Sequence, residues 1–255
     1  MNREFRSRLK TSELLVGTIV TVPSTEGVEI LVDTGFDWLF IDTEHGSFDA
    51  ESAQQLLQAA GRNFPCVIRV PADDEIWIKK MLDIGATGVI VPQIRSAQQV
   101  EHVVSLCRFP PTGSRGMGIS RANRYGGEFQ DYVDHANQYI CVIVQVEHVD
   151  AVDDIDTIVA VSGLDAVFIG PYDLSASLGK PGQVEDPQVQ QAIERIREAC
   201  LSAGVGLGIF GIDAAAVIPY VNRGFHLIAI GTDSVFLSRA AGDALFSLSM
   251  SQRAH

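Results

Sequence analysis

The chain has 255 residues, of which 46% are hydrophobic and 20% are charged, a balance that suits one large globular domain. Its formal net charge is -13, so neither a nucleic-acid backbone nor an anionic membrane surface is an expected partner. The sequence contains no apolar run of the ~18 residues needed to cross a membrane, and its charged start lacks the apolar core of a secretion signal. The four cysteines are scattered and form no Cys-x-x-Cys pair, which favours free thiols in a reducing cytoplasm.

Apolar, β-branched runs alternate with amphipathic segments along the chain, the pattern of buried parallel strands separated by helices. The predicted strands are 15–22, 38–41, 66–70, 88–92, 142–147, 167–169, 206–210 and 225–230. The predicted helices are 24–35, 49–61, 78–85, 96–107, 150–161, 186–200, 213–221 and a last one that begins near 235. Eight strand–helix units without a linker favour an α/β fold, a (β/α)8 TIM barrel that forms a single domain over residues 1–255.

Two of the predicted strands lead into acidic residues, Glu147 and Asp173. In a parallel sheet both carboxylates would emerge at the same edge, where they repel each other unless a proton or a metal lies between them. Hard oxygen ligands with the Gln145 amide beside them favour Mg²⁺ or Mn²⁺. The alternative is that both acids are simply solvated where the strands end, and this pair alone does not decide between the two interpretations.

Other polar residues also stand at predicted strand ends, where a β/α barrel has its active site. They are Asp42, His45, Arg69, Gln93 and Gln145. A cation held by two carboxylates keeps positions open for a chelating 2-keto acid. Arg69 is then suited to stabilise an enolate oxygen, and His45, held by Asp42, is suited to move a proton. The inventory therefore predicts enolate chemistry on a keto acid.

Two common catalytic or cofactor-binding features are missing from the sequence. Lys10, Lys79, Lys80 and Lys180 all lie outside the predicted strands, which argues against a Schiff-base lysine. No Gly-x-Gly-x-x-Gly motif follows the first strand and no Walker-type lysine loop is present, which argues against nucleotide binding.

Five segments occur in a characteristic order. They are Gly35 to His45 (GFDWLFIDTEH), Arg69, Pro110 to Gly116 (PPTGSRG), Gln145-x-Glu147, and Gly170 to Ser175 (GPYDLS). Taken as a set they resemble the HpcH/HpaI aldolase family, the metal-dependent class II pyruvate aldolases such as 4-hydroxy-2-oxoheptanedioate aldolase. The resemblance runs from about Gly17 to about Arg239, which is nearly the whole chain.

The resemblance implies a reaction between a pyruvate-like 2-keto acid and an aldehyde, with Mg²⁺, Mn²⁺ or Co²⁺ as cofactor. By the family pattern Glu147 and Asp173 hold the metal, His45 is the base and Arg69 steadies the enolate. Gln145, Asp173 and the backbone at Tyr172 would contact the keto acid.

The resemblance also assigns a supporting acid for the histidine to Asp83. Asp83 closes a predicted helix, and helix carboxyl ends lie at the face of the barrel away from the site. It would therefore act only on the site of a neighbouring subunit, and the alternative is a solvated acid at a helix end. Similar proteins form hexamers (trimers of dimers) in which the last helix packs on a partner, so a homo-oligomer is expected.

The sequence departs from the family pattern near the aldehyde side. Tyr172 stands where relatives commonly carry alanine, and Phe210 lies in a run that is apolar where some relatives place a polar residue. The identity of the aldehyde, and the choice between pyruvate and hydroxypyruvate, therefore stay open.

Three other functions compete with this prediction. One is an acyl-CoA lyase, for which Arg115, Arg121 and Arg124 in the long irregular segment 109–127 would supply a basic track. Another is a decarboxylase of oxaloacetate. The last is a barrel that binds a carboxylate ligand without catalysis, which would show no metal-dependent exchange of pyruvate methyl protons.

Overall fold

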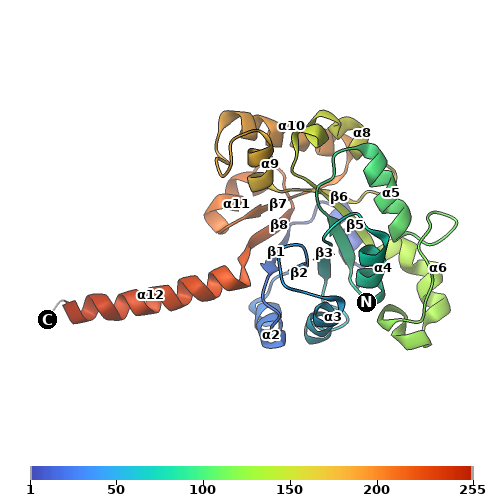
Figure 1. The fold of residues 1–255 in the computed structure, drawn as a ribbon, viewed down its shortest axis with the longest axis horizontal. Helices are drawn as coiled ribbons and strands as arrows, with labels where there is room; N and C mark the ends of the chain where they lie inside the picture. The colour runs from blue at the N-terminus through green and yellow to red at the C-terminus, as the bar shows by residue number, and fades with distance from the viewer. Residues whose placement is uncertain (1, 254–255) are drawn as a thin grey trace.

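A computed structural model describes residues 2–253, with side chains through residue 249. Its eight strands form one closed parallel barrel in chain order, in which β8 pairs with β1. The strands are β1 (Leu15–Val20), β2 (Trp38–Asp42), β3 (Cys66–Arg69), β4 (Gly88–Val91), β5 (Cys141–Val146), β6 (Ala166–Ile169), β7 (Gly206–Gly211) and β8 (Leu227–Thr232). The predicted (β/α)8 barrel is confirmed, and Figure 1 shows its helices arranged around the strands.

Thirteen helical segments connect or flank the strands in the described part of the chain. They are α1 (Phe5–Lys10), α2 (Thr25–Thr34), α3 (Ala50–Ala59), α4 (Glu75–Asp83), α5 (Ala97–Cys107), the 3-10 helix η1 (Arg121–Gly126), α6 (Phe129–Tyr139), α7 (Val149–Asp153), α8 (Ile155–Val159), α9 (Pro171–Ser177), α10 (Pro187–Ala203), α11 (Ala214–Val221) and α12 (Asp233–Arg253). Side chains fix where several of them begin. Ser24 accepts from the Gly27 N–H and Asp49 from the Ser52 N–H, which satisfies donors that a first helical turn leaves open.

The structure differs from the predicted helices in five places. Helices α1, η1, α6 and α9 were not predicted, and the predicted helix 150–161 is two short helices, α7 and α8. Helix α6 buries Tyr132, Ala136 and Tyr139, a stripe with aromatic and small residues in place of an aliphatic one. Helix α9 has Pro171 at its first position, where proline is well tolerated. Asp173 therefore lies in the first turn of a helix and not in a loop.

The inside of the barrel is filled by aromatic side chains. The Trp38 and Phe40 rings stack with centroids 6.0 Å apart, and Phe40 meets the edge of Phe168 at 5.6 Å. Phe5 of α1 packs on Trp38 at 6.0 Å and closes the amino-terminal end of the barrel. A Cβ at residue 208 would lie 2.5 Å from the Phe168 ring, so glycine is required there. This packing leaves the carboxyl-terminal end of the strands as the open one.

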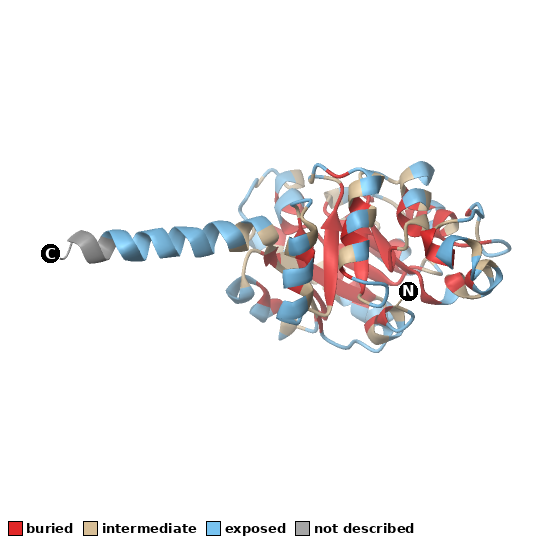
Figure 2. Ribbon diagram, turned by 90° about the horizontal axis from the view of Figure 1, so that it is seen from below, coloured by how far each residue is buried: buried red, intermediate tan, exposed pale blue. Residues whose placement is uncertain are grey.

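Helix α12 extends away from the barrel, and Figure 2 shows it exposed beyond its first turns as far as residue 249. It nevertheless carries large apolar side chains: Leu237, Leu245, Phe246 and Leu248 are each more than half exposed. Within residues 2–253, no helix combines the length and the apolar character needed to cross a membrane.

Candidate active site

A cavity of about 230 Å³ opens at the carboxyl-terminal end of the barrel. Its walls come from seven of the eight strands or from the residues that follow them. The lining residues are Ile19, Thr21, Phe40, Asp42, His45, Arg69, Gln145, Phe168, Gly170, Pro171, Tyr172, Asp173, Phe210 and Thr232. No lysine is among these described residues, which agrees with the argument against a Schiff-base mechanism.

Arg69 is the central cation of the cavity. Asp42 is its neighbour in the β2–β3 register, so the two side chains leave the barrel together. The guanidinium donates to both oxygens of Asp42, at 2.8 and 2.7 Å, and its Nη1 lies 3.3 Å from Gln145 Oε1 and 3.1 Å from Glu44 Oε2. The Arg69 guanidinium is held on both of its edges, so its orientation is fixed, as in bidentate arginine–carboxylate pairs.

The protein environment shifts the pKa values of Arg69 and Glu44. Burial lowers the pKa of Arg69, but the Asp42 hydrogen bonds and the nearby acids outweigh it, so the arginine pKa is raised and the group stays charged. Burial also raises the pKa of Glu44, against the lowering effect of the Arg69 charge. Asp42 and Glu44 therefore hold a permanent cation at the wall of the cavity.

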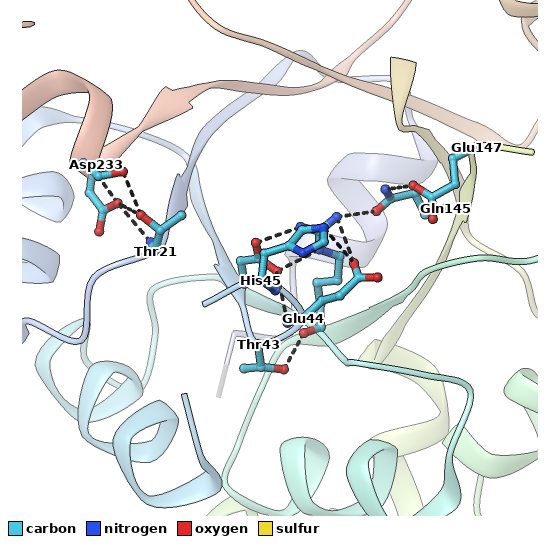
Figure 3. A network of polar contacts seen from close by, with 10 residues as sticks. Thr21, Thr43, Glu44, His45, Gln145, Glu147 and Asp233 are labelled. Carbon is cyan, nitrogen blue, oxygen red and sulfur yellow. Dashed lines mark hydrogen bonds and ion pairs between the residues drawn. The ribbon is translucent and has the colours of Figure 1, made fainter. Parts of the chain in front are cut away.

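Glu147 follows β5 and is 2% exposed. Its Oε1 accepts from the Gln93 backbone N–H at 2.8 Å, and its Oε2 accepts from the Gln145 side-chain amide. Gln145 therefore links Arg69 to Glu147, as Figure 3 shows for the amide and the acid. A Cβ at residue 170 would lie 2.6 Å from Glu147 Oε2, so Gly170 makes room for this carboxylate.

The environment of Glu147 disfavours an isolated negative charge. Burial raises its pKa to about 7, the Gln93 hydrogen bond opposes the rise, and the charge of Asp173 adds to it. Asp173 lines the cavity from the first turn of α9. Among residues 2–249 neither acid has an ion-pair partner within 4.0 Å, and a divalent cation would relieve their repulsion.

The protein alone supplies only part of the ligands that such a cation needs. No group of three or more His, Cys, Asp or Glu side chains among the described residues could hold a metal together. Two hard carboxylates are nevertheless a usual protein contribution to a Mg²⁺ site, which keeps further positions for substrate and water. The two acids therefore fit a metal that binds together with a chelating substrate.

The His45 ring lines the cavity, with 69% of its side chain exposed. Its Nε2 lies 4.0 Å from Glu44 Oε2, and the ring is not bonded to Asp42 as the sequence suggested. The Asp42 carboxylate binds Arg69 and accepts from the backbone N–H groups of Glu44 and His45. The expected contact between Asp42 and the His45 ring was therefore wrong, because Arg69 takes both oxygens of Asp42.

Asp83 ends α4 and does not line the cavity. Its Oδ1 accepts from Arg115 Nη2 at 2.7 Å, and the same nitrogen lies 3.0 Å from the Tyr132 hydroxyl. The Arg115 guanidinium is fully buried and lies over the Phe109 ring at 4.6 Å. Within this chain Asp83 is thus the partner of a buried arginine, away from the other predicted site residues.

Several site residues were missed in the sequence. Glu44 was quoted only as part of a motif, although it holds Arg69. Thr21 and Thr232 line the cavity from the ends of β1 and β8, and Phe40 lines it from the middle of β2. The position of the two threonines at strand ends was the available signal, but it marks polar and apolar residues alike.

This geometry defines a class of enzyme: a β/α barrel whose cavity combines a fixed guanidinium with the Asp173 carboxylate, while the buried Glu147 carboxylate lies near enough to feel the charge of Asp173. The model of the HpcH/HpaI aldolase/citrate lyase family matches residues 20–240, so the chain belongs to that family. It is therefore an enzyme that makes or breaks carbon–carbon bonds, a lyase.

The chain resembles named relatives over most of its length. It is 38% identical over 240 residues to a hydroxypyruvate/pyruvate aldolase of Pseudomonas aeruginosa, covering 92% of this chain and 89% of that one. It is 35% identical to a 4-hydroxy-2-oxovalerate aldolase of Novosphingobium aromaticivorans, covering 94% and 92%. A solved HpcH/HpaI aldolase/citrate lyase family protein from Burkholderia cenocepacia J2315 superposes with a TM-score of 0.94 at 37% identity, covering 97% and 100%.

Proposed function

We propose that this enzyme is a divalent-metal-dependent aldolase that makes or cleaves 4-hydroxy-2-keto acids through the enolate of pyruvate or hydroxypyruvate and an aldehyde. The observation that carries the proposal is the Asp42–Arg69–Gln145–Glu147 chain of hydrogen bonds. It fixes the Arg69 cation at the cavity wall and joins it, through Gln145, to the buried Glu147 carboxylate, which is not itself a lining residue. The relatives named for keto-acid aldol reactions support the substrate class.

Glu147 and Asp173 are the residues that would hold Mg²⁺, Mn²⁺ or Co²⁺. When bound, such a cation supplies positive charge that offsets the two carboxylates and polarises the keto oxygen of the substrate. The raised pKa of Glu147 supports this assignment, because a carboxylate that is costly to ionise alone gains most from a bound cation.

Arg69 donates hydrogen bonds to the keto oxygen, where negative charge grows as the enolate forms. It is suited to this because Asp42 has fixed its direction in advance. The Gln145 amide and the Tyr172 backbone orient the keto acid beside it. We expect these contacts to strengthen in the transition state.

His45 moves the protons. In the synthetic direction a methyl proton leaves C3 of pyruvate and its electron pair forms the enolate. C3 then bonds to the aldehyde carbon, and the resulting alkoxide takes one proton. Cleavage is the reverse, with the proton of the 4-hydroxyl group removed first. The open position of the ring at the cavity mouth supports this role.

Asp83 assists His45 only if two subunits meet, so its role is tied to a homo-oligomer. The exposed apolar side chains of α12 beside a groove lined by Val22, Ile30 and Phe236 support packing of this helix on a partner. We propose a hexamer built as a trimer of dimers, in which Asp83 of one subunit faces the site of the next.

The acyl-CoA alternative is not supported by the arginines it would need. Arg115 is buried against Asp83, and Arg121 donates to the Ile84 and Leu57 carbonyl oxygens. Arg124 is exposed but pairs with Glu128 at 2.8 Å. All three side chains therefore serve internal contacts: Arg115 and Arg124 pair with acids, and Arg121 binds backbone carbonyl oxygens.

The test is deuterium exchange at the pyruvate methyl group, followed by NMR in D₂O with and without a chelator and without any aldehyde. An aldolase of this kind exchanges the methyl protons only with metal present. A barrel that merely binds a carboxylate would show no exchange. A product screen with oxaloacetate, pyruvate and hydroxypyruvate then separates decarboxylation from aldol addition.

A further inference from the structure

The cavity extends beyond the keto-acid residues into a sector made by the start of α9 and by β7, β8 and β1 with the residues that follow them. We call it the acceptor sector and define it by Ile19, Thr21, Tyr172, Phe210 and Thr232, all of which line the cavity. In the barrel order these strands come after β5 and β6, which lead to the two acids, and β7 lies opposite β3, which carries Arg69. The second substrate must occupy this sector if the keto acid occupies the first.

Aromatic rings form one wall of the acceptor sector. The Tyr172 and Phe210 rings lie 6.4 Å apart between centroids with an interplanar angle of 52°. Tyr172 is 46% exposed, although a ring of this size is normally buried more deeply. The Phe168 ring lines the same cavity from the end of β6. A flat apolar ligand would bury surface that the free protein leaves in water.

The polar groups of the sector are already engaged with the start of α12. The Thr21 hydroxyl donates to Asp233 at 2.6 Å, and both Thr21 and Thr232 lie 2.9 Å from the Ser234 hydroxyl. The Thr232 hydroxyl also accepts from the Val235 N–H. A polar substituent on the ligand would have to compete with these internal hydrogen bonds.

The charge balance of the cavity opposes a second anion. Arg69 and His45 are the only basic residues among the described residues that line it. Arg69 is already bonded to Asp42 and Glu44, while Asp173 and the Asp233 behind Thr21 add negative charge. An acceptor with a carboxylate tail would meet acids on this side and no unpaired arginine.

We propose that the acceptor aldehyde of this enzyme is uncharged and carries an aromatic or other flat apolar group, which packs against Tyr172 and Phe210. This assignment rests on the proposed aldolase function and names the chemical class of its second substrate, the aldehyde. Phe210 and Tyr172 are then the residues that set specificity, and neither takes part in proton transfer.

The test compares aldehydes that differ in one property, with pyruvate as the common donor. Benzaldehyde and 4-carboxybenzaldehyde differ in charge, and benzaldehyde and glyceraldehyde differ in polarity. We expect kcat/KM for benzaldehyde to exceed both others by roughly tenfold, the size of an ordinary aromatic contact plus an avoided charge. Equal values, or a preference for either of the other two, would overturn the proposal.

Two variants test whether the aromatic wall of Tyr172 and Phe210 causes the preference for benzaldehyde. Phe210→Ala should lower kcat/KM for benzaldehyde relative to that for glyceraldehyde by roughly 2- to 10-fold. Tyr172→Phe keeps the ring and should keep the preference for benzaldehyde. If Phe210→Ala does not fold, Phe210→Leu removes the ring alone and is expected to shift the same ratio. A ratio that neither substitution at residue 210 changes would refute the assigned wall.

The exchange of pyruvate methyl protons without aldehyde separates failure of the acceptor assignment from failure of the aldolase function. Exchange by the wild-type enzyme without any preference for benzaldehyde overturns the acceptor assignment and leaves the aldolase function standing. Absence of exchange and of product overturns both.

Discussion

The Asp42 carboxylate binds Arg69 through both of its oxygens, at 2.8 and 2.7 Å, with both side chains less than a tenth exposed. Removing one partner of such a buried pair leaves the other charge uncompensated. We expect Asp42→Ala to lower the free energy of unfolding by ~3 kcal/mol in urea denaturation. Glu13→Gln, which breaks the solvent-exposed pair with Arg8, is the control and should change it far less. Equal small effects would contradict the structural role of the Asp42 pair.

In the proposed reaction, Arg69 acts on the negative charge that develops as the enolate forms. Arg69→Ala is therefore expected to reduce kcat by ~100- to 1000-fold, corresponding to ~2.7–4 kcal/mol of barrier. Arg69→Lys keeps the charge but not the fork held by Asp42, and should recover only part of the loss. Steady-state kinetics check this, since a defect confined to KM would indicate that Arg69 only binds the substrate.

The proposed metal site consists of Glu147 after β5 and Asp173 in the first turn of α9. Glu147→Ala and Asp173→Ala should each abolish tight Mn²⁺ binding, measured by calorimetry without substrate. Glu101→Gln removes an exposed acid of α5 and serves as the matched control. Unchanged affinity in Glu147→Ala would show that the metal, if any, binds elsewhere.

The raised pKa of Glu147 makes the stability of the metal-free enzyme depend on pH. Between its usual 4.5 and about 7 the folded state keeps a proton that the unfolded chain releases. The contribution to stability is thus full below pH 4.5 and is lost as pH rises through about 7. In chelator, the melting temperature of the wild type relative to Glu147→Gln should fall over that window. A constant difference between the two proteins would be evidence against the shift.

The proposed role of Asp83 across a subunit interface can be tested by mixing two variants. If it serves the neighbouring subunit, co-expressed chains carrying Asp83→Ala and His45→Ala should form mixed oligomers in which some sites are intact. We expect such mixtures to regain activity that neither variant has alone. Because Asp83 also pairs with the buried Arg115, both variants must first be shown to be folded by circular dichroism. Inactive mixed oligomers would limit Asp83 to its structural contact.

The sequence predicted the barrel well because its strands are continuous apolar runs, a signal that survives without tertiary context. It did not predict α6, whose buried stripe of Tyr132, Ala136 and Tyr139 is short and flanked by polar residues. Nor did it predict α9, which is only seven residues long and starts directly after a strand. Short helices that depend on packing lack a periodic signal of useful length.

For the site, strand-end position was enough to bring Asp42, Arg69, Gln145 and Asp173 to one cavity. It was not enough to decide which partner each side chain would choose. The bidentate bond between Asp42 and Arg69 follows from the β2–β3 register, and the contact between Thr21 and Asp233 follows from the pairing of β1 with β8. The first depends on the exact register of neighbouring strands and the second on closure of the barrel, and no local sequence pattern encodes either.

The aromatic plug formed by Phe5, Trp38 and Phe40 leaves the barrel with a single entrance. Glu147, at 2% exposed, lies deep, whereas Tyr172 is 46% exposed near the surface. We therefore expect a compulsory order of binding. In synthesis the keto acid binds before the aldehyde, and in cleavage the aldehyde leaves before the keto acid. Steady-state inhibition patterns should accordingly be those of an ordered sequential enzyme. Excess aldehyde should inhibit the reaction, because it slows the entry of the keto acid.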